Sequence, residues 1–490
     1  MYPDRDFDPK SELPANEIAL TQDLELETLW DAMADGDPFL YGIARPAVLL
    51  GLTDPDEIVY RQRVLTDCLE HEEVVRQMYA LAIEAIQSER KVNWLMSSAS
   101  PDRILYRSVE ILKLQVAVLR RLRQLAEETA GSFQSDGFTR FFAMLQQELD
   151  DDYLQTVERH LQALSFRRGV LISAALAKGN KGSGYVVRTP RRRRWTEQLP
   201  LGKRPASFTF QIPPRDDRGF LALANIRNRG INPVSNSIAR SAEHVKSFFD
   251  MVRSELAFYL GCLNLHERLD EKAEPTCLPI PLPVGRSVID ARGLYDVCLA
   301  LHVDERVVGN ELGADDKSLV LITGANQGGK STLLRGVGVA QLMMQSGMFI
   351  GAEAFRANVC EGIFTHFKRE EDTSMERGKL DEELSRMSDI AEAIAPNCLL
   401  LCNESFASTN EREGPEIARQ VVRALLEKGI KIFFVTHMFD LASGFHAQGL
   451  RTALFLRAER KPDGTRTFRI TEGEPLSTSF GGDSYRRIFG

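Results

Sequence analysis

The sequence predicts an α/β domain with a doubly wound, mostly parallel sheet, preceded by a mainly α-helical core or lever domain with a small basic insertion of strands and loops. Two observations predict this order. Apolar residues recur at helical spacing through much of the first half of the chain, whereas the second half alternates apolar runs with helical segments. The 490 residues, 43% of them apolar, suffice for about three domains with large cores.

The helical domain is predicted over 51–275, after an N-terminal segment, 1–50, in which Pro and Gly interrupt the pattern. Its predicted helices have apolar inner stripes and charged outer faces, which is typical of long rods. The first begins at about residue 56, and the other three span 103–128, about 138–165 and 237 to about 269.

A basic insertion is predicted within this helical domain, over 166–236. Residues 167–240 carry 16 Lys/Arg and three Asp/Glu, in a chain whose formal net charge is −8. This segment is also rich in Gly and Pro, and "GYVVR" and "SFTFQIP" are short strand candidates within it. A basic segment in an acidic chain favours a polyanionic partner.

The candidate contact residues of the insertion are basic, with one aromatic side chain. They are Arg191, Arg192, Arg193, Arg194, Trp195, Lys178 and Lys181. Guanidinium groups suit phosphate contacts, and an indole can stack on a base or sugar. We therefore favour nucleic acid, bound through its backbone and hence with strong salt dependence. The alternatives are a solvated basic loop or a patch that binds acidic parts of this protein.

The α/β domain is predicted over 278–490, after the Pro-rich boundary "EPTCLPIPLPVG". Its strand candidates are "SLVLITG", "GIFTHF", "CLLLCNES" and "KIFFVTH". Unbroken or nearly unbroken apolar runs of this kind are typical of parallel strands that are buried on both faces.

The first of these strands leads into "GANQGGKST", which matches the phosphate-loop pattern GxxxxGK[ST] and precedes a helical segment. Glycines let backbone N–H groups approach phosphate oxygens, and the helix N-terminus favours anions. Lys330 would reach the β and γ phosphates, and the Ser331 hydroxyl would bind Mg²⁺. The complete loop is Gly324, Ala325, Asn326, Gln327, Gly328, Gly329, Lys330, Ser331 and Thr332.

Two further strand ends carry candidate catalytic groups. Glu404 follows "CLLLCN", at the edge where open α/β sheets bind ligands, and is expected to orient or activate the attacking water. Asn403 stands on the magnesium side, where its amide oxygen can accept a hydrogen bond from a metal-bound water but brings no charge. His437, after "FFVT", is expected to contact the γ-phosphate or the water. The alternative interpretation is that these residues are polar strand ends with a structural role and no part in catalysis.

Cysteine usage and the N-terminus predict a cytoplasmic protein. The seven cysteines include no CxxC pair, which favours reduced thiols. The polar, acidic start of the sequence does not resemble a signal peptide, and no apolar run approaches the roughly 20 residues that span a membrane.

With these motifs in place, the sequence resembles the MutS family of DNA mismatch-repair proteins. The resemblance rests on "LITGANQGGKSTLLRG", on "GMFIGA" and "IFT" after it, on "NESFASTNEREG", on "THMFDLA" and on "STSFGGDSY". It is strong over about 310–485 and collinear over about 50–270, where "DEIVYRQRVLTDC" resembles the start of the family's core helical domain.

The resemblance implies a P-loop ATPase that uses ATP and Mg²⁺. The phosphate loop would bind ATP, with Glu404 as the catalytic carboxylate and His437 as a switch histidine. It further implies a homodimer with composite sites, in which a signature segment, "DTSMERGKLDEEL" with Ser374, covers the partner's γ-phosphate. It implies a clamp on DNA, set by ATP binding and reset by hydrolysis, in repair or recombination of mismatched, branched or distorted DNA.

The sequence also departs from the family. It has no recognisable mismatch-reading domain and no Phe-x-Glu wedge before the helical core, and Asn403 replaces the family's Asp, from which we expect slow hydrolysis. A second hypothesis is an ATPase switch that acts on a protein partner. A transporter cassette is disfavoured because the LSGGQ signature is absent.

Overall fold

The computed structural model of the chain describes residues 1–93, 100–166, 169–188, 208–285, 287–369, 378–407 and 412–476. It divides into two compact units. Unit 1 comprises Met1–Val75, Gln134–Phe138 and Ser254–Gly490; unit 2 comprises Arg76–Phe133 and Thr139–Arg253. No helix within the described ranges is both long and apolar enough to cross a membrane.

The largest sheet of unit 1 has six strands in the order β12-β11-β6-β10-β9-β8. All neighbouring pairs are parallel except β11 and β12, which are antiparallel. Their bounds are β6 Leu319–Gly324, β8 Ile363–Phe367, β9 Leu399–Asn403, β10 Lys431–Val435, β11 Ala453–Arg460 and β12 Arg466–Glu472. All four strand candidates of the sequence lie in this sheet, which places unit 1 in the α/β class.

Helices cover both faces of this sheet because alternate side chains of its buried strands point to opposite sides. On one face, Leu400 and Cys402 join a core cluster with side chains of α12 (Lys379–Ala393), α13 (Glu413–Glu427) and α14 (Phe439–His446). On the other face, Leu401 meets α11 (Lys330–Gln345), where a Cβ on Gly338 would lie 2.6 Å from the Leu401 side chain. Glycine thus permits this close helix–strand approach, and a larger residue would have to displace the leucine side chain.

The N-terminal segment belongs to unit 1 and is helical, with α1 (Glu17–Asp23), α2 (Leu26–Ala34) and α3 (Pro38–Leu49), followed by α4 (Pro55–Glu70). Helix α1 packs beside β8, where the Asn16 side-chain amide donates to the Ile363 carbonyl at 2.7 Å. The helical domain predicted over 51–275 is divided between the two units, because residues 51–75 and 254–275 lie in unit 1.

A second sheet of unit 1, in the order β3-β7-β4-β5, was not predicted. Its strands are β3 (Ile280–Leu282), β4 (Ile289–Leu294), β5 (Asn310–Gly313) and β7 (Ala354–Asn358), and the short helix α10 (Val297–His302) follows β4. These strands have three to six residues, and partly or fully exposed positions interrupt their buried ones, so they lack the apolar runs that identified the larger sheet.

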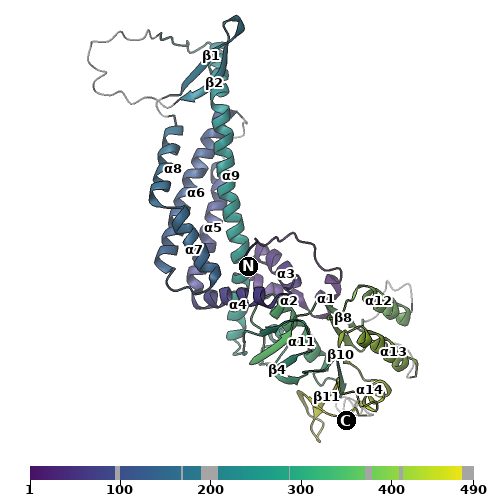
Figure 1. Ribbon diagram of the computed structural model, residues 1–490. Helices are drawn as coiled ribbons and strands as arrows, with labels where there is room; N and C mark the ends of the chain where they lie inside the picture. Colours follow the sequence, from purple (N-terminus) through teal and green to yellow (C-terminus); the bar gives the residue numbers. More distant parts are fainter. Residues whose placement is uncertain are drawn as a thin grey trace. The chain divides into compact units, whose positions relative to one another are not determined.

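Unit 2 is mainly helical, as expected, and Figure 1 shows its helices running side by side with a two-stranded hairpin at one end. The helices are α5 (Glu72–Asn93), α6 (Pro101–Thr129), α7 (Asp136–Glu148), α8 (Asp151–Leu164) and α9 (Asp217–Asp270), and the unit boundaries fall within α5, α7 and α9. Buried apolar side chains from α6, α8 and α9, including Leu112, Leu161 and Ile231, form its core.

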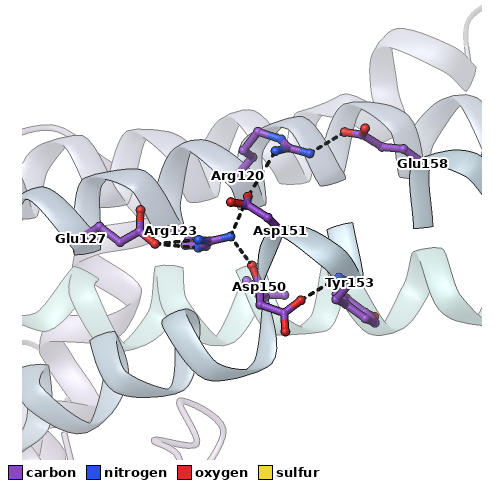
Figure 2. Close-up of polar contacts among 8 residues, drawn as sticks. Arg120, Arg123, Glu127, Asp150, Asp151, Tyr153 and Glu158 are labelled. Atoms are coloured by element: carbon purple, nitrogen blue, oxygen red, sulfur yellow. Dashed lines mark hydrogen bonds and ion pairs between the residues drawn. The ribbon is translucent and has the colours of Figure 1, made fainter. Parts of the chain in front are cut away.

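The helix predicted over about 138–165 is two helices, and the break has a local cause. The Asp150 side chain accepts a hydrogen bond from the Tyr153 backbone N–H at 2.7 Å, which caps the start of α8. Arg123 of α6 donates to the Leu149 carbonyl at 2.9 Å, just beyond the end of α7, and pairs with Glu127 and Asp151 (Figure 2).

The described part of the predicted basic insertion contains a hairpin and the start of a helix. Strands β1 (Leu171–Leu176) and β2 (Gly182–Arg188) form a hairpin, so "GYVVR" is confirmed as a strand, whereas the described part of "SFTFQIP", 208–213, has no strand. Helix α9 begins 20 residues before the predicted start at 237. Its added part contains Pro233 and Gly230, but good helix formers such as Leu221 and Ala222 precede them and compensate.

Candidate nucleotide site

The phosphate loop lies between β6 and α11, as the motif predicts, and glycines shape it. Gly324 ends β6 with φ +108°, and Gly329 precedes α11 with φ +90°. A Cβ on Gly324 would lie 2.9 Å from the Ala458 backbone nitrogen, and one on Gly328 would lie 2.7 Å from the Ala458 Cβ. The neighbouring strand β11 therefore leaves no room for side chains here, and the loop backbone curls tightly into the N-terminus of α11.

Lys330 is anchored within this loop. Its side chain is buried, and its Nζ donates to the carbonyls of Gly324 at 3.1 Å and Ala325 at 3.0 Å. Burial lowers the pKa of Lys330, and the nearby Glu404 carboxylate opposes this shift. An ammonium group has three hydrogens, so one remains for an anionic ligand in the loop.

Ser331 and Asn403, the two predicted magnesium-side residues, meet although 72 positions separate them. The Ser331 hydroxyl donates to the Asn403 Oδ1 at 2.9 Å. Hydroxyl and amide oxygens are hard ligands of the type that Mg²⁺ prefers, directly or through water, and the pair stands at the first turn of α11 beside the loop. The residues present thus fit a magnesium ion that is completed by phosphate oxygens and water.

This pair lacks a carboxylate of its own. Within the described residues, no group of three or more His, Cys, Asp or Glu side chains could hold a metal ion. The charge that balances Mg²⁺ would therefore come mainly from the nucleotide, which is consistent with the weaker retention expected from Asn403.

Glu404 and His437 follow the neighbouring parallel strands β9 and β10, so their side chains meet at the carboxyl edge of the sheet. The His437 Nδ1 lies 3.7 Å from the Glu404 Oε1. His437 lowers the pKa of Glu404, whereas partial burial acts in the opposite direction. Glu404 is thus a carboxylate at neutral pH, able to accept a hydrogen bond from water.

The structure adds one neighbour of the loop that the sequence did not indicate. Arg466 of β12 donates from its Nε to the Asn326 carbonyl at 3.2 Å, across 140 positions. It brings positive charge beside the loop and opposes protonation of Lys330. No local pattern marks this arginine, because only the pairing of β12 with β11 brings it here.

The predicted DNA-contact residues are in part described. Lys178 and Lys181 are exposed at the turn of the β1–β2 hairpin in unit 2, where the Ala177 N–H donates to the Lys181 carbonyl at 2.8 Å. Ser374 and the aromatic and arginine positions of the insertion lie outside the described residues. The latter are Arg191, Arg192, Arg193, Arg194 and Trp195.

Two family models match separate parts of the chain. The MutS2 N-terminal domain matches residues 53–272, and MutS domain V matches residues 320–483. The first match lies in the helical region that precedes the boundary at 278, and the second covers the α/β region from β6 onward, including the phosphate loop.

Individual relatives agree with these matches. The chain is 31% identical over 157 residues to the endonuclease MutS2 of Thermus thermophilus and 27% identical over 253 residues to that of Lacticaseibacillus casei. It is 34% identical over 137 residues to the DNA mismatch repair protein MutS of Thermotoga neapolitana. The aligned parts cover 32%, 51% and 28% of this chain, and 21%, 30% and 17% of these relatives. On the matched domains and the geometry of the loop, the chain belongs to the MutS family.

Proposed function

We propose that this chain is an ATP-binding and ATP-hydrolysing switch that acts on DNA in repair or recombination. One observation carries the ATPase assignment. The phosphate loop with Lys330, the Ser331–Asn403 pair and the Glu404–His437 pair converge at the carboxyl edge of one parallel sheet. A loop that binds anions, oxygen ligands for Mg²⁺ and a carboxylate for water are the groups that phosphoryl transfer to water requires.

Each group has a distinct role in this proposal. The loop backbone and Lys330 hold the phosphates, and Ser331 with Asn403 hold magnesium on its side of the site. Magnesium, when bound, neutralises charge on the phosphate oxygens. Glu404 orients the attacking water, and His437 restrains the Glu404 carboxylate from the neighbouring strand.

Slow turnover is part of the proposal. The Asn403 amide accepts a hydrogen bond but lacks the negative charge of a carboxylate. We therefore expect the site to hold Mg²⁺ weakly, and this weak binding to limit the rate of hydrolysis. Such an enzyme would remain ATP-bound for long periods, as a switch requires.

The DNA-directed part of the proposal has separate support. Relatives that share the chain's domains are named as endonuclease and mismatch-repair proteins. The described part of the basic insertion exposes Lys178 and Lys181 at a hairpin turn, where their ammonium groups are accessible to backbone phosphates. We further propose a homodimer with composite ATP sites, to which Ser374 of each subunit contributes, and clamping on mismatched, branched or distorted DNA.

The nucleotide site is tested by Lys330→Ala and Glu404→Gln. Lys330→Ala should lose ATP binding, whereas Glu404→Gln should bind ATP normally and lose hydrolysis by about 10²-fold or more. Lys317→Ala is the matched control, because Lys317 stands just before the other end of β6 and donates to a backbone carbonyl there. Normal ATP affinity of Lys330→Ala, measured with a fluorescent analogue, would refute the site assignment.

DNA binding is tested separately from ATP binding. Replacing Lys178 and Lys181 by Ala, and in a second variant the four arginines 191–194 by Ala, should weaken binding to branched DNA and flatten its salt dependence. The ATPase rate without DNA should stay unchanged. If both variants bind DNA as the native chain does, the second hypothesis, a switch for a protein partner, is favoured.

A further inference from the structure

The turn that carries Glu404 is held in an unfavourable backbone conformation. Glu404 has φ +55° and Phe406 has φ +63°, and neither is a glycine. Positive φ is uncommon for a bulky aromatic residue and persists only where the surroundings enforce it. Phe406 is buried, so the core around this turn decides where the Glu404 carboxylate points.

The side chain that contacts this turn from β8 is His366. It is fully buried, and its Nδ1 lies 2.7 Å from the Ser405 Oγ, the residue directly after Glu404. The Ser405 Oγ also lies 2.7 Å from the His366 carbonyl oxygen. The imidazole ring stacks on Phe406, with ring centroids 5.5 Å apart and planes 26° apart. His366 thus contacts both residues that follow the proposed catalytic carboxylate.

The other ring nitrogen of His366 points to α12. Its Nε2 lies 3.0 Å from the Glu383 carbonyl oxygen. A carbonyl only accepts, so Nε2 must carry a hydrogen. Burial, together with Arg386 and Arg369, lowers the pKa of His366 to about 4, so the ring is neutral and Nδ1 is an acceptor. Ser405 therefore shares its single hydroxyl hydrogen between Nδ1 and the His366 carbonyl.

A second hydrogen bond joins α12 to the same strand. Arg386 donates from its Nη1 to the Phe367 carbonyl at 3.0 Å. Phe367 is the register partner of Asn403, and Lys368 donates its N–H to the Asn403 carbonyl at 2.9 Å. The end of β8 therefore lies between α12 and the strand that bears the catalytic groups.

We propose that His366 is a positioning residue for ATP hydrolysis, which fixes the Glu404 turn through Ser405 and Phe406 and transmits displacements of α12 to it. This inference rests on the proposed ATPase function. The rigid imidazole ring forms one hydrogen bond to α12 through Nε2 and one to Ser405 through Nδ1. A shift of α12 therefore changes the hydrogen bond that holds the residue after Glu404.

A purely structural role for His366 makes a different prediction. If the ring only fills the core, any comparable loss of packing around α12 should reduce activity equally. Met387 of α12 provides this comparison, because it is buried in the same core cluster. Met387→Ala loosens the packing of α12 without removing either hydrogen bond of His366.

The test compares His366→Phe, Ser405→Ala and Met387→Ala. Phenylalanine keeps an aromatic ring against Phe406 but removes both nitrogens, and Ser405→Ala removes the hydrogen bond to Nδ1 from the other side. For both we expect kcat for ATP to fall about tenfold with KM changed less than twofold, since positioning affects the transition state and not binding. Met387→Ala should lower the melting temperature and keep kcat within about twofold of the native value.

A second measurement does not depend on hydrolysis. Addition of a non-hydrolysable ATP analogue with Mg²⁺ should slow amide hydrogen exchange in residues 379–393 of the native chain, and His366→Phe should abolish this change while it still binds the analogue. Native kcat in His366→Phe and Ser405→Ala, an equal loss of kcat in Met387→Ala, or exchange that responds identically in His366→Phe would each overturn the positioning role. A native chain that binds no nucleotide would overturn the proposed function, and this inference with it.

Discussion

Replacing Asn403 by Asp tests whether the missing carboxylate limits the proposed ATP hydrolysis. Asn403 accepts from the Ser331 hydroxyl at 2.9 Å, so Asp fits the same position with nearly the same volume. A hydrogen bond to a neutral group contributes about 0.5–1.5 kcal/mol and one to a charged group about 1.5–3 kcal/mol. A hydrogen bond from a metal-bound water to the new carboxylate in place of the amide should therefore be stronger by about 1–1.5 kcal/mol, which corresponds to a roughly tenfold higher magnesium affinity of Asn403→Asp.

The new charge also has a cost without metal. Glu404 is the adjacent residue and is ionised, because His437 lowers its pKa. Two neighbouring carboxylates repel, so Asn403→Asp should be less stable than the native chain in magnesium-free buffer and regain stability as Mg²⁺ is added.

The assay is the ATPase rate at saturating ATP as a function of free Mg²⁺. We expect the half-saturating concentration to fall about tenfold in Asn403→Asp, with higher turnover at low Mg²⁺. Asn397→Asp is the matched control, since Asn397 is exposed and precedes the opposite end of β9. An unchanged magnesium dependence in Asn403→Asp would refute the placement of this residue beside the metal.

Three further predictions concern the loop, the buried histidine and unit 2. Gly328→Ala should lose ATP binding with little change in overall stability, measured by analogue titration and thermal melting, because its Cβ would lie 2.7 Å from that of Ala458 and displace the loop. The folded pKa of His366, about 4, lies below the ordinary 6.5, so the unfolded chain binds more protons between these values and stability is lost as pH falls from 6.5 toward 4. In urea titrations over this pH range, the free energy of unfolding should fall by up to about 3 kcal/mol more for the native chain than for His366→Phe. An equal fall in both would argue against a buried neutral ring. Arg123→Ala should lower the free energy of unfolding by about 1–2 kcal/mol, as the Leu149 carbonyl loses its donor, whereas Arg121→Ala, which removes an exposed pair, should change it by less than about 0.5 kcal/mol in the same urea titration.

Local signals identified most residues of the candidate nucleotide site. The loop residues are recognisable because a strand, a glycine-rich turn and a helix follow one another within a short stretch. Glu404 and His437 were predicted from apolar runs that end in a polar side chain, and parallel strands bring such ends to one edge. The chemical roles of these residues stay predictions, and so does the role of Ser374, which lies outside the described residues.

Local signals failed where long-range packing decided the outcome. The strands of the second sheet are short and only partly buried, so they lack the unbroken apolar runs that identified the strands of the larger sheet. The early start of α9 has no clear local signal, because Gly230 and Pro233 disfavour a helix where the helix formers before them favour one. The N-terminal segment contained helices that its Pro and Gly breaks concealed.

The sequence by itself determined the class of the α/β domain and the identity of the groups at its strand ends, because buried parallel strands and phosphate loops are built from contiguous residues. Only the tertiary structure decided which distant groups pair. Ser331 meets Asn403, Arg466 reaches the loop, and His366 joins Ser405 to α12. These contacts depend on the order of the strands in the sheet, which long-range packing fixes and which no local pattern encodes.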